Sequence, residues 1–236
     1  KYLAEHGHFD SRTKAREAIE AGLVRANGRT VLKPSEDIKS GAEISAKAPY
    51  PWVSRAGLKL DYALDKFSVS TKGRTCIDLG ASTGGFTQVL LARGASKVYA
   101  VDVGTAQLHE SLHDDLRIVS MENRDARTLT TADFSAPFNL IVCDVSFISA
   151  VKVLPAAMDV CSRPAELITL VKPQFEVGKD GIGKGGIVRD GELAKAALTR
   201  TIEWITAQGW QVKASDISPI KGGSGNTEYL LYAASA

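Results

Sequence analysis

The stretch Thr75-Cys76-Ile77-Asp78-Leu79-Gly80-Ala81-Ser82-Thr83-Gly84-Gly85-Phe86 decides the fold of this 236-residue chain. Its first five residues form a short apolar run, which predicts a buried strand. Residues 80–85 are rich in glycine, which lets the backbone bend sharply and lets a ligand approach it closely. A helix that begins near Phe86 directs its free N–H groups at whatever lies over that turn. The stretch therefore predicts a strand, a ligand-binding turn and a helix.

The spacing of the glycines separates two kinds of nucleotide pocket. The dinucleotide fingerprint Gly-x-Gly-x-x-Gly needs a glycine at position 82, where this chain has Ser82. An acidic residue followed by Gly-x-x-x-Gly resembles instead the first motif of class I S-adenosylmethionine (SAM) methyltransferases. Asp102 ends the next apolar run, where a carboxylate can accept both ribose hydroxyls, and Asp125 suits an adenine amino group. A doubly wound domain with another nucleotide, or with none, is the alternative.

Strands and helices alternate through the large C-terminal part of the chain. The predicted strands are Thr75–Leu79, Lys97–Val101, Leu116–Val119, Asn139–Cys143, Ala165–Val171, Gln211–Ile217 and Thr227–Ala233, the last two as an antiparallel hairpin. The predicted helices are Ala56–Phe67, Phe86–Arg93, Ala106–Leu112, Ala150–Cys161 and Asp190–Gln208. This alternation predicts an α/β fold, a mostly parallel seven-stranded sheet with helices on both faces. Ligands of such sheets bind beyond the carboxyl ends of the strands.

Residues 1–47 predict a separate, small α+β module. Ser11 is a suitable N-cap for a helix that ends before Gly22, and Asn27-Gly28 between two short apolar runs indicates a hairpin. The module resembles the RNA-binding domain named after ribosomal protein S-four, although the Arg-Leu-Asp segment that usually opens that domain is absent. Its predicted RNA-binding residues are Arg12, Lys14, Arg16, Arg25 and Arg29. The alternative is a solvated basic helix on a docking module.

Residues 48–53 predict a stiff linker, because Pro49 and Pro51 restrict the backbone. The catalytic domain is then expected over residues 54–236.

Beyond its glycine-rich turn, the sequence Gly178–Gly185 nearly matches a phosphate-binding Walker loop, but Gly185 stands where Ser or Thr is required. We expect a loop beside the site instead, with Lys179, Lys184 and Arg189 available for RNA phosphates.

Charged residues end two otherwise apolar strands. Asp144 follows Asn139–Cys143 and Lys172 follows Ala165–Val171, so both are expected at the ligand-binding edge of the sheet. Glu228 lies at the start of the last strand, and Lys59 lies beside the apolar stripe of the first large helix. A lysine near carboxylates and a second lysine can act as a base, as deprotonation of a ribose 2′-hydroxyl requires.

Lys59, Asp144, Lys172 and Glu228 match in order the Lys-Asp-Lys-Glu tetrad of 2′-O-ribose methyltransferases of the FtsJ/RrmJ type. The motifs Ser54–Leu60, Asp78–Phe86, Cys143–Ser149 and Val171–Glu176 resemble those of the TlyA family, and the resemblance covers nearly the whole chain. It implies SAM as cofactor and ribosomal RNA or ribosomal subunits as partner, methylated on cytidine 2′-hydroxyls. In the implied mechanism Lys172 is the base, Asp144 orients it and the methyl donor, and Lys59 and Glu228 support it.

The resemblance also implies the cofactor-binding set. It comprises Asp78, Gly80, Ala81, Ser82, Thr83, Gly84, Gly85, Phe86, Asp102, Val103, Asp125, Ala126 and Asp144. Phe147, beside this set, is expected either to stack on a base or to pack in the core. Cys143 could act as a thiolate nucleophile, but its place in an apolar strand favours a buried thiol.

Composition limits the remaining possibilities. The net charge of +2 permits nucleic-acid binding without demanding it. Neither a membrane-spanning run nor a signal segment is evident, and the three separated cysteines favour a cytoplasmic protein. The histidines and cysteines show no metal-ligand spacing, so no metal is expected. Members of the TlyA family are often labelled hemolysins, and a membrane-active hemolysin or a non-catalytic RNA-binding protein remain the rival functions.

Overall fold

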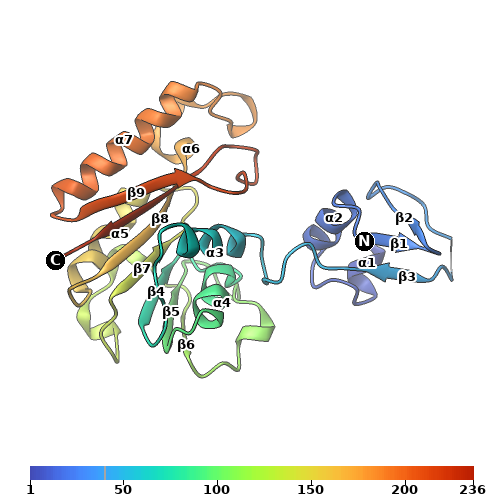
Figure 1. Cartoon of the computed structure of the whole chain (residues 1–236), viewed down its shortest axis with the longest axis horizontal. Helices are drawn as coiled ribbons and strands as arrows, with labels where there is room; N and C mark the ends of the chain where they lie inside the picture. Colours follow the sequence, from blue (N-terminus) through green and yellow to red (C-terminus); the bar gives the residue numbers. More distant parts are fainter. Residues whose placement is uncertain (40) are drawn as a thin grey trace. The chain divides into compact units, whose positions relative to one another are not determined.

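The computed structural model describes residues 1–39 and 41–236, and within them the side chain of Lys179 lies outside the description. The chain forms two compact units, Lys1–Ser54 and Arg55–Ala236 (Figure 1). Each unit has its own buried core.

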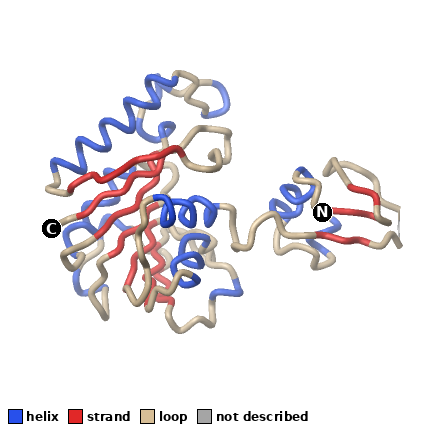
Figure 2. The backbone as a smooth tube through the Cα atoms, viewed as in Figure 1, coloured by secondary structure: helices blue, strands red, loops and turns tan. Residues whose placement is uncertain are grey.

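The larger unit is built on a seven-stranded sheet with the order β6-β5-β4-β7-β8-β10-β9 (Figure 2). Its strands are β4 (Thr75–Leu79), β5 (Lys97–Val101), β6 (Ile118–Met121), β7 (Leu140–Cys143), β8 (Glu166–Val171), β9 (Gln211–Ile217) and β10 (Tyr229–Ala234). Strands β4 to β8 are parallel, and β10 runs antiparallel to both of its neighbours. The predicted fold class is confirmed.

Helices cover both faces of this sheet. They are α3 (Ala56–Lys66), α4 (Gly85–Ala92), α5 (Ala150–Val160), α6 (Pro173–Glu176) and α7 (Gly191–Ala207), and short 3-10 turns cover 110–112, 126–128, 131–133, 179–181 and 184–186. Ile77 and Leu79 of β4 belong to the core cluster that α5 and α7 join. Because side chains alternate along a strand, Asp78 faces the other side, where it meets Thr87 of α4.

The predicted helix over Ala106–Leu112 is wrong. Only Glu110–Leu112 form a single 3-10 turn, and the preceding residues form a loop in which Ala106 has φ +50°. The physical reason is the backbone conformation, because a residue with φ +50° is not right-handed helical; the carboxylate of Glu122 accepts the N–H groups of 106–108 and holds this loop. The neighbouring strand also lies later than predicted, at Ile118–Met121.

The antiparallel strand β10 brings the end of the chain to the carboxyl edge of the parallel strands. Tyr229 pairs with Val171, the last residue of β8. This register places Glu228 beside Lys172, although 55 positions separate them in sequence. Two charged residues from opposite ends of this unit, Lys59 and Glu228, therefore meet because β10 runs in reverse.

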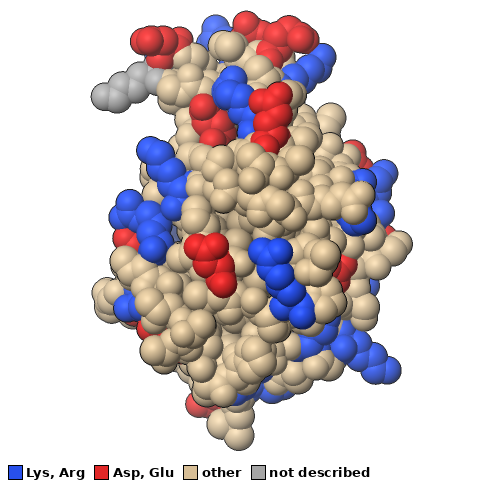
Figure 3. Space-filling view, turned by 90° about the vertical axis from the view of Figure 1, so that its left-hand side faces the viewer, with Lys and Arg blue, Asp and Glu red and all other residues tan. Residues whose placement is uncertain are grey.

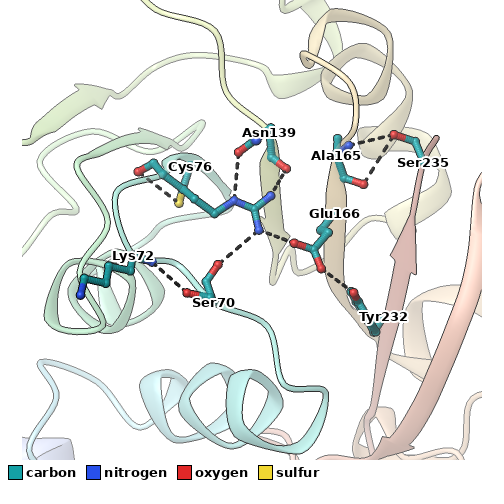
Figure 4. A network of polar contacts seen from close by, with 9 residues as sticks. Ser70, Lys72, Cys76, Asn139, Ala165, Glu166, Tyr232 and Ser235 are labelled. Atoms are coloured by element: carbon teal, nitrogen blue, oxygen red, sulfur yellow. Dashed lines mark hydrogen bonds and ion pairs between the residues drawn. The ribbon is translucent and has the colours of Figure 1, made fainter.

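At the opposite end of the strands, Arg74, which precedes β4, holds their starts together. Figure 4 shows its partners Ser70, Asn139 and Glu166. Its Nε donates to Asn139 Oδ1 at 3.0 Å and its Nη1 to Ser70 O at 3.2 Å, and its guanidinium pairs with Glu166 of β8. Glu166 also accepts from the Tyr232 hydroxyl of β10. This network ties the starts of three strands together at the edge away from the ligand-binding side.

The smaller unit contains α1 (Tyr2–Glu5), α2 (Arg12–Glu20) and a sheet of β1 (Val24–Ala26), β2 (Arg29–Thr30) and β3 (Ile44–Ala46) in the order β2-β1-β3. The predicted N-cap and hairpin are confirmed, since Ser11 Oγ accepts Lys14 N–H at 3.1 Å and β1 pairs antiparallel with β2. Strand β3 was not predicted from the sequence.

Lys14 is buried and therefore does not lie on the exposed RNA-contacting surface that was predicted. Its ammonium is 10% exposed, pairs with Asp10 at 3.2 Å and donates to Trp52 O at 3.2 Å. Arg12 and Arg16 on the same helix, and Arg29 of the hairpin, are each more than 60% exposed. Arg25 is exposed as well. Lys14 therefore stabilises the small unit, and the other four present positive charge to solvent.

One face of the molecule is shown in Figure 3. Acidic and basic side chains are interspersed there over a largely uncharged surface. Among the described residues on this face, basic side chains do not form a continuous stripe, so this face offers no continuous basic surface for a nucleic acid.

In the part of the chain that the structure describes, no helix is long and apolar enough to span a membrane.

Candidate active site

Four charged side chains of opposite sign meet beyond the carboxyl end of the sheet. Lys172 Nζ lies 2.6 Å from Asp144 Oδ1, and Lys59 Nζ lies 3.4 Å from Asp144 Oδ2. Lys59 Nζ also lies 2.7 Å from Glu228 Oε2. The four side chains are at most 10% exposed, so solvent screens these pairs weakly. They form a continuous Lys172–Asp144–Lys59–Glu228 chain with no net charge.

Different elements supply the members of this chain. Asp144 follows β7, and Lys172 is the N-cap residue of α6 directly after β8. Lys59 comes from the buried side of α3, and Glu228 precedes β10. Gly222 is required beside Glu228, because a Cβ there would lie 2.4 Å from Glu228 Oε1.

Sequence reasoning did not find Ser146, which contacts the predicted base. Lys172 Nζ donates to Ser146 Oγ at 2.8 Å, and a longer contact of 3.5 Å joins it to the carbonyl of Asp144. Ser146 belongs to the Cys143–Ser149 motif, and a hydroxyl two residues after Asp144 was the signal that could have identified it.

The glycine-rich turn is held by close packing. Gly80 has φ +81°, and a Cβ there would lie 3.0 Å from Val145 Cγ1 and 3.2 Å from Asp144 O. Gly84 has φ +90°, and a Cβ there would lie 2.5 Å from Leu112 and 2.7 Å from Leu108. Both positions therefore exclude larger residues, on conformation and on space. Gly84 is also the N-cap of α4.

A cavity of about 490 Å³ opens between this turn and the chain of charges. It is lined by Gly80, Ser82, Val101, Asp102, Val103, Arg124, Asp125, Ala126, Arg127, Asp144, Val145, Ser146, Phe147, Ile148 and Val153. Its volume and mixed polar and apolar lining suit a small-molecule ligand. Seven of the thirteen predicted cofactor-binding residues are in this lining: Gly80, Ser82, Asp102, Val103, Asp125, Ala126 and Asp144.

The other six predicted cofactor-binding residues lie in the turn and helix behind the cavity. Ala81, Gly85 and Phe86 are buried, and Phe86 is 2% exposed within α4. Thr83 O accepts His109 N–H at 3.2 Å. With Gly84 and Asp78, these residues shape the turn and do not line the cavity.

The two carboxylates at the cavity rim, Asp102 and Asp125, each accept hydrogen bonds from within the protein. Asp102 accepts Ser82 N–H at 2.8 Å and Gly104 N–H at 2.7 Å. Asp125 pairs with Arg127 at 2.6 Å and accepts its backbone N–H at 2.9 Å, which lowers the pKa of Asp125 to about 2. These bonds fix both carboxylates in place, with lone pairs left for ligand donors.

Asp78 is completely buried on the α4 side of β4. Thr87 Oγ1 donates to its Oδ2 at 2.7 Å, and its Oδ1 has no hydrogen-bond partner within the structure. Burial raises the pKa of Asp78 to about 7, and the charges of Asp144 and Asp102 act in the same direction. This carboxyl group can therefore carry a proton near neutral pH.

Phe147 is nearly free of the core. It is 92% exposed, has φ +66° and lies with its ring centroid 5.5 Å from that of Phe175. The exposure removes the core-packing alternative, and it leaves an aromatic surface at the mouth of the cavity.

The predicted basic loop lies next to the segment that carries Glu228. Asn226, 2% exposed, donates from Nδ2 to Gly186 O at 2.8 Å and accepts Val188 N–H at 2.9 Å. Lys184 and Arg189, in this loop, are both exposed. The predicted contact of Lys179 lies outside the described side chains.

Two further features concern rival chemistry. Cys143 is fully buried, and burial raises the pKa of its thiol to about 12, which disfavours a nucleophilic thiolate. Within residues 1–39 and 41–236, no group of three His, Cys, Asp or Glu side chains could hold a metal ion.

Comparison with known proteins defines the class of this chain. A model of the FtsJ-like methyltransferase family matches residues 52–235, and one of the S4 domain matches residues 1–44. An S-adenosylmethionine dependent methyltransferase from Mesorhizobium loti has the same fold at 14% identity, with a TM-score of 0.54 over 73% of this chain and 96% of that one. The chain is a SAM-dependent FtsJ-like methyltransferase with an S4 domain.

Relatives over nearly the full length narrow the class to one family. The "16S/23S rRNA (cytidine-2'-O)-methyltransferase TlyA" of Mycobacterium tuberculosis is 43% identical, covering 98% of this chain and 87% of that protein. "Hemolysin A" of Brachyspira hyodysenteriae is 41% identical, covering 98% and 97%. A solved structure from Streptococcus thermophilus, named as a hemolysin, has a TM-score of 0.81 at 41% identity, covering 99% of this chain and 86% of that one. The chain belongs to the TlyA family.

Proposed function

We propose that this protein transfers a methyl group from SAM to cytidine 2′-oxygens of ribosomal RNA, with Lys172 as the base. The observation that carries the proposal is the Lys172–Asp144–Lys59–Glu228 chain beside the 490 Å³ cavity. The names of its relatives support the substrate, since the proteins of M. tuberculosis and Campylobacter jejuni are both named as rRNA cytidine-2'-O-methyltransferases. A ribosomal RNA substrate supports a cytoplasmic location of the protein.

The cavity lining fits the methyl donor. Asp102 and Asp125 would accept from the ribose hydroxyls and the adenine amino group, and the backbone at Gly80 allows close approach. Val103 and Ile148 would supply apolar contact to the base. When bound, SAM supplies a methyl group activated by its sulfonium charge.

Lys172 is positioned to take the 2′-hydroxyl proton. A neutral amine has one lone pair. Lys172 Nζ donates to Ser146 Oγ at 2.8 Å and lies 2.6 Å from Asp144 Oδ1, and these two contacts orient the side chain. The lone pair is then free for the 2′-hydroxyl. The 2′-hydroxyl O–H bond would break and its proton would go to Lys172 Nζ. The oxygen would bond to the methyl carbon while the bond between that carbon and the SAM sulfur breaks, and the sulfur would keep the electron pair and leave as S-adenosylhomocysteine.

Lys59 acts through its neighbours rather than on the hydroxyl. It bridges Asp144 and Glu228, and this pairing fixes the carboxylate that holds Lys172. The contact with Glu228 at 2.7 Å offsets the cost of burying the Lys59 side chain. We assign Lys59 and Glu228 as positioning residues for the base.

The RNA side of the reaction involves both units. Arg12, Arg16, Arg25 and Arg29 of the S4 domain, with Lys184 and Arg189 of the catalytic domain, would contact phosphates. Phe147 would stack on an unpaired base at the mouth of the cavity, since every base offers a face to an aromatic ring.

Methyl transfer from tritiated SAM to ribosomal subunits and to naked ribosomal RNA tests the proposal. Nuclease digestion should place the label on a ribose 2′-oxygen of cytidine. Label on a base would overturn the role of Lys172. Binding of SAM with no label on any RNA would identify a non-catalytic RNA-binding protein, and leakage of liposomes by the SAM-free protein would favour a membrane-active hemolysin.

Phe147→Ala tests the stacking contact. Loss of one base–aromatic stack costs about 1–3 kcal/mol, so we expect kcat/KM for RNA to fall roughly tenfold to a hundredfold. SAM affinity should stay within threefold, and Phe147→Tyr should retain most of the activity. Equal kcat/KM for Phe147→Ala and the unaltered protein would remove the base contact from the proposal.

A further inference from the structure

Glu122 directly follows β6 and holds a neighbouring loop by its backbone. Its Oε2 accepts Ala106 N–H at 2.6 Å, and its Oε1 accepts Gln107 and Leu108 N–H at 2.7 and 3.0 Å. These bonds, that from Leu108 first, lower the pKa of Glu122, so the carboxylate is charged at neutral pH. One side chain thus fixes three consecutive amides of the loop.

The bonds of Glu122 continue as a ladder toward the cavity. Asn123 N donates to Gly104 O at 3.0 Å, Thr105 Oγ1 donates to Asn123 Oδ1 at 2.5 Å, and Arg124 N donates to Asp102 O at 2.9 Å. The ladder therefore joins 102–108 to 122–124. One cavity carboxylate, Asp102, begins the first segment, and the other, Asp125, directly follows the second.

The loop that Glu122 holds, residues 102–108, also packs against the glycine-rich turn. The Cδ1 of Leu108 lies 2.7 Å from the place that a Cβ of Gly84 would occupy, and His109 N donates to Thr83 O at 3.2 Å. At its other end, Val103 is 72% exposed and lines the cavity. The loop thus connects three parts of the cavity rim: the turn, Val103 and Asp102.

We propose that Glu122 is a positioning residue for the nucleoside end of the methyl donor, because it sets the spacing of Asp102 and Asp125 and seats Leu108 against the glycine-rich turn. The proposal rests on the proposed function only in taking the cavity as the SAM site. Glu122 is not itself in the cavity lining, so its effect passes through the loop.

Glu122→Gln tests the proposal, since it keeps the length of the side chain and replaces an acceptor oxygen by an amide donor that repels the N–H groups. We expect the calorimetric Kd for SAM to rise about tenfold. At saturating SAM, kcat and the KM for RNA should change less than twofold. Hydrogen exchange at the amides of 106–108 should accelerate, whereas the amides of β4 should keep their protection. Glu110→Gln, an exposed acid beside the same loop, is the matched control and should leave both readings unchanged.

Each failure has its own meaning. Unchanged exchange at 106–108 would show that the carboxylate does not hold the loop, and faster exchange with unchanged SAM affinity would show that the loop does not set the site. Either result overturns the proposal. Failure of the unaltered protein to bind SAM would overturn the proposed function instead.

Discussion

At the scale of single residues, the proposed proton transfer depends on where four buried charged side chains lie. Lys172, Asp144, Lys59 and Glu228 are at most 10% exposed, so each charge depends on its neighbour for stabilisation. Ser146 adds a hydroxyl at 2.8 Å from the base, and a hydroxyl can accept or donate as the base changes its protonation state. The resemblance to a family identified the four charged residues, whereas Ser146 became evident only from its distance.

Lys172→Met is expected to abolish the proton transfer and leave the rest of the site in place. Lysine and methionine have similar length, and Asp144 keeps its contact with Lys59 at 3.4 Å. General-base catalysis contributes about 10²–10⁴, so we expect kcat to fall about a thousandfold with SAM affinity within threefold. Lys152→Met, on the exposed side of α5, is the control. Undiminished turnover would remove Lys172 from the mechanism.

Asp78 links stability to pH. Its pKa rises from 3.8 to about 7 on folding, so between about pH 4 and 7 the folded state holds a proton that the unfolded state has lost. Its contribution to stability is therefore greatest below pH 4 and is lost as the pH rises through 7. Asp78→Asn removes this loss and can still accept from Thr87.

The stability gain of Asp78→Asn over the unaltered protein should accordingly grow between pH 5 and pH 8, toward an upper value of about 4 kcal/mol. Thermal unfolding of both proteins at the two pH values measures it. The same difference at pH 5 and pH 8 would mean that Asp78 has an ordinary pKa.

At the scale of elements, the two ends of the parallel strands have different tasks: one end forms the cavity, and the other holds the network around Arg74. The carboxyl ends of β4, β5, β7 and β8 supply the cavity and the base, and the start of β10 supplies Glu228. At the other edge, Arg74 joins the starts of β4, β7 and β8. The Arg74 network and the proposed active site therefore lie at opposite ends of the same strands.

Arg74→Met should destabilise the catalytic unit without touching the site. It removes the part-buried ion pair with Glu166 and the part-buried bond to Asn139, together with the exposed bond to Ser70 O. We expect a loss of about 2–3 kcal/mol in the free energy of unfolding by urea. The exposed neighbour Lys72→Met should cost almost nothing. A loss of SAM affinity in Arg74→Met under folding conditions would contradict this separation.

At the scale of the whole molecule, two units with separate cores divide the work. The S4 domain presents exposed arginines on α2 and its hairpin, and the catalytic domain holds the cavity. A structured RNA is large enough to contact a basic surface and a reaction site at once. We therefore expect RNA affinity and SAM affinity to be separable by substitution.

Arg12→Ala combined with Arg16→Ala tests that division. Each phosphate contact contributes about one to the slope of log K against log salt, so the slope should fall by about two and RNA affinity by about tenfold. SAM affinity should not change. Lys152→Ala combined with Lys213→Ala removes the same charge from exposed positions of the catalytic domain and is the control. An equal effect of both pairs would show a nonspecific dependence on net charge.

The sequence by itself determined the elements that depend on local signals. Alternation of apolar runs and amphipathic segments predicted the seven strands, and Ser11, Gly22 and Asn27-Gly28 marked ends and turns through short-range backbone chemistry. Spaced glycines and acids, with the family resemblance, pointed to the cofactor and to the tetrad.

Tertiary structure decided whatever depends on groups distant in the chain. Glu122 binds the amides of 106–108 in the loop that stands where a helix was predicted, and the fold draws Lys14 into the small unit beside Asp10 and the Trp52 carbonyl. The antiparallel register of β10 brings Glu228 to Lys172, and the turn after β7 brings Ser146 to the same ammonium. Such contacts arise from competition among partners in space, which local propensity does not record.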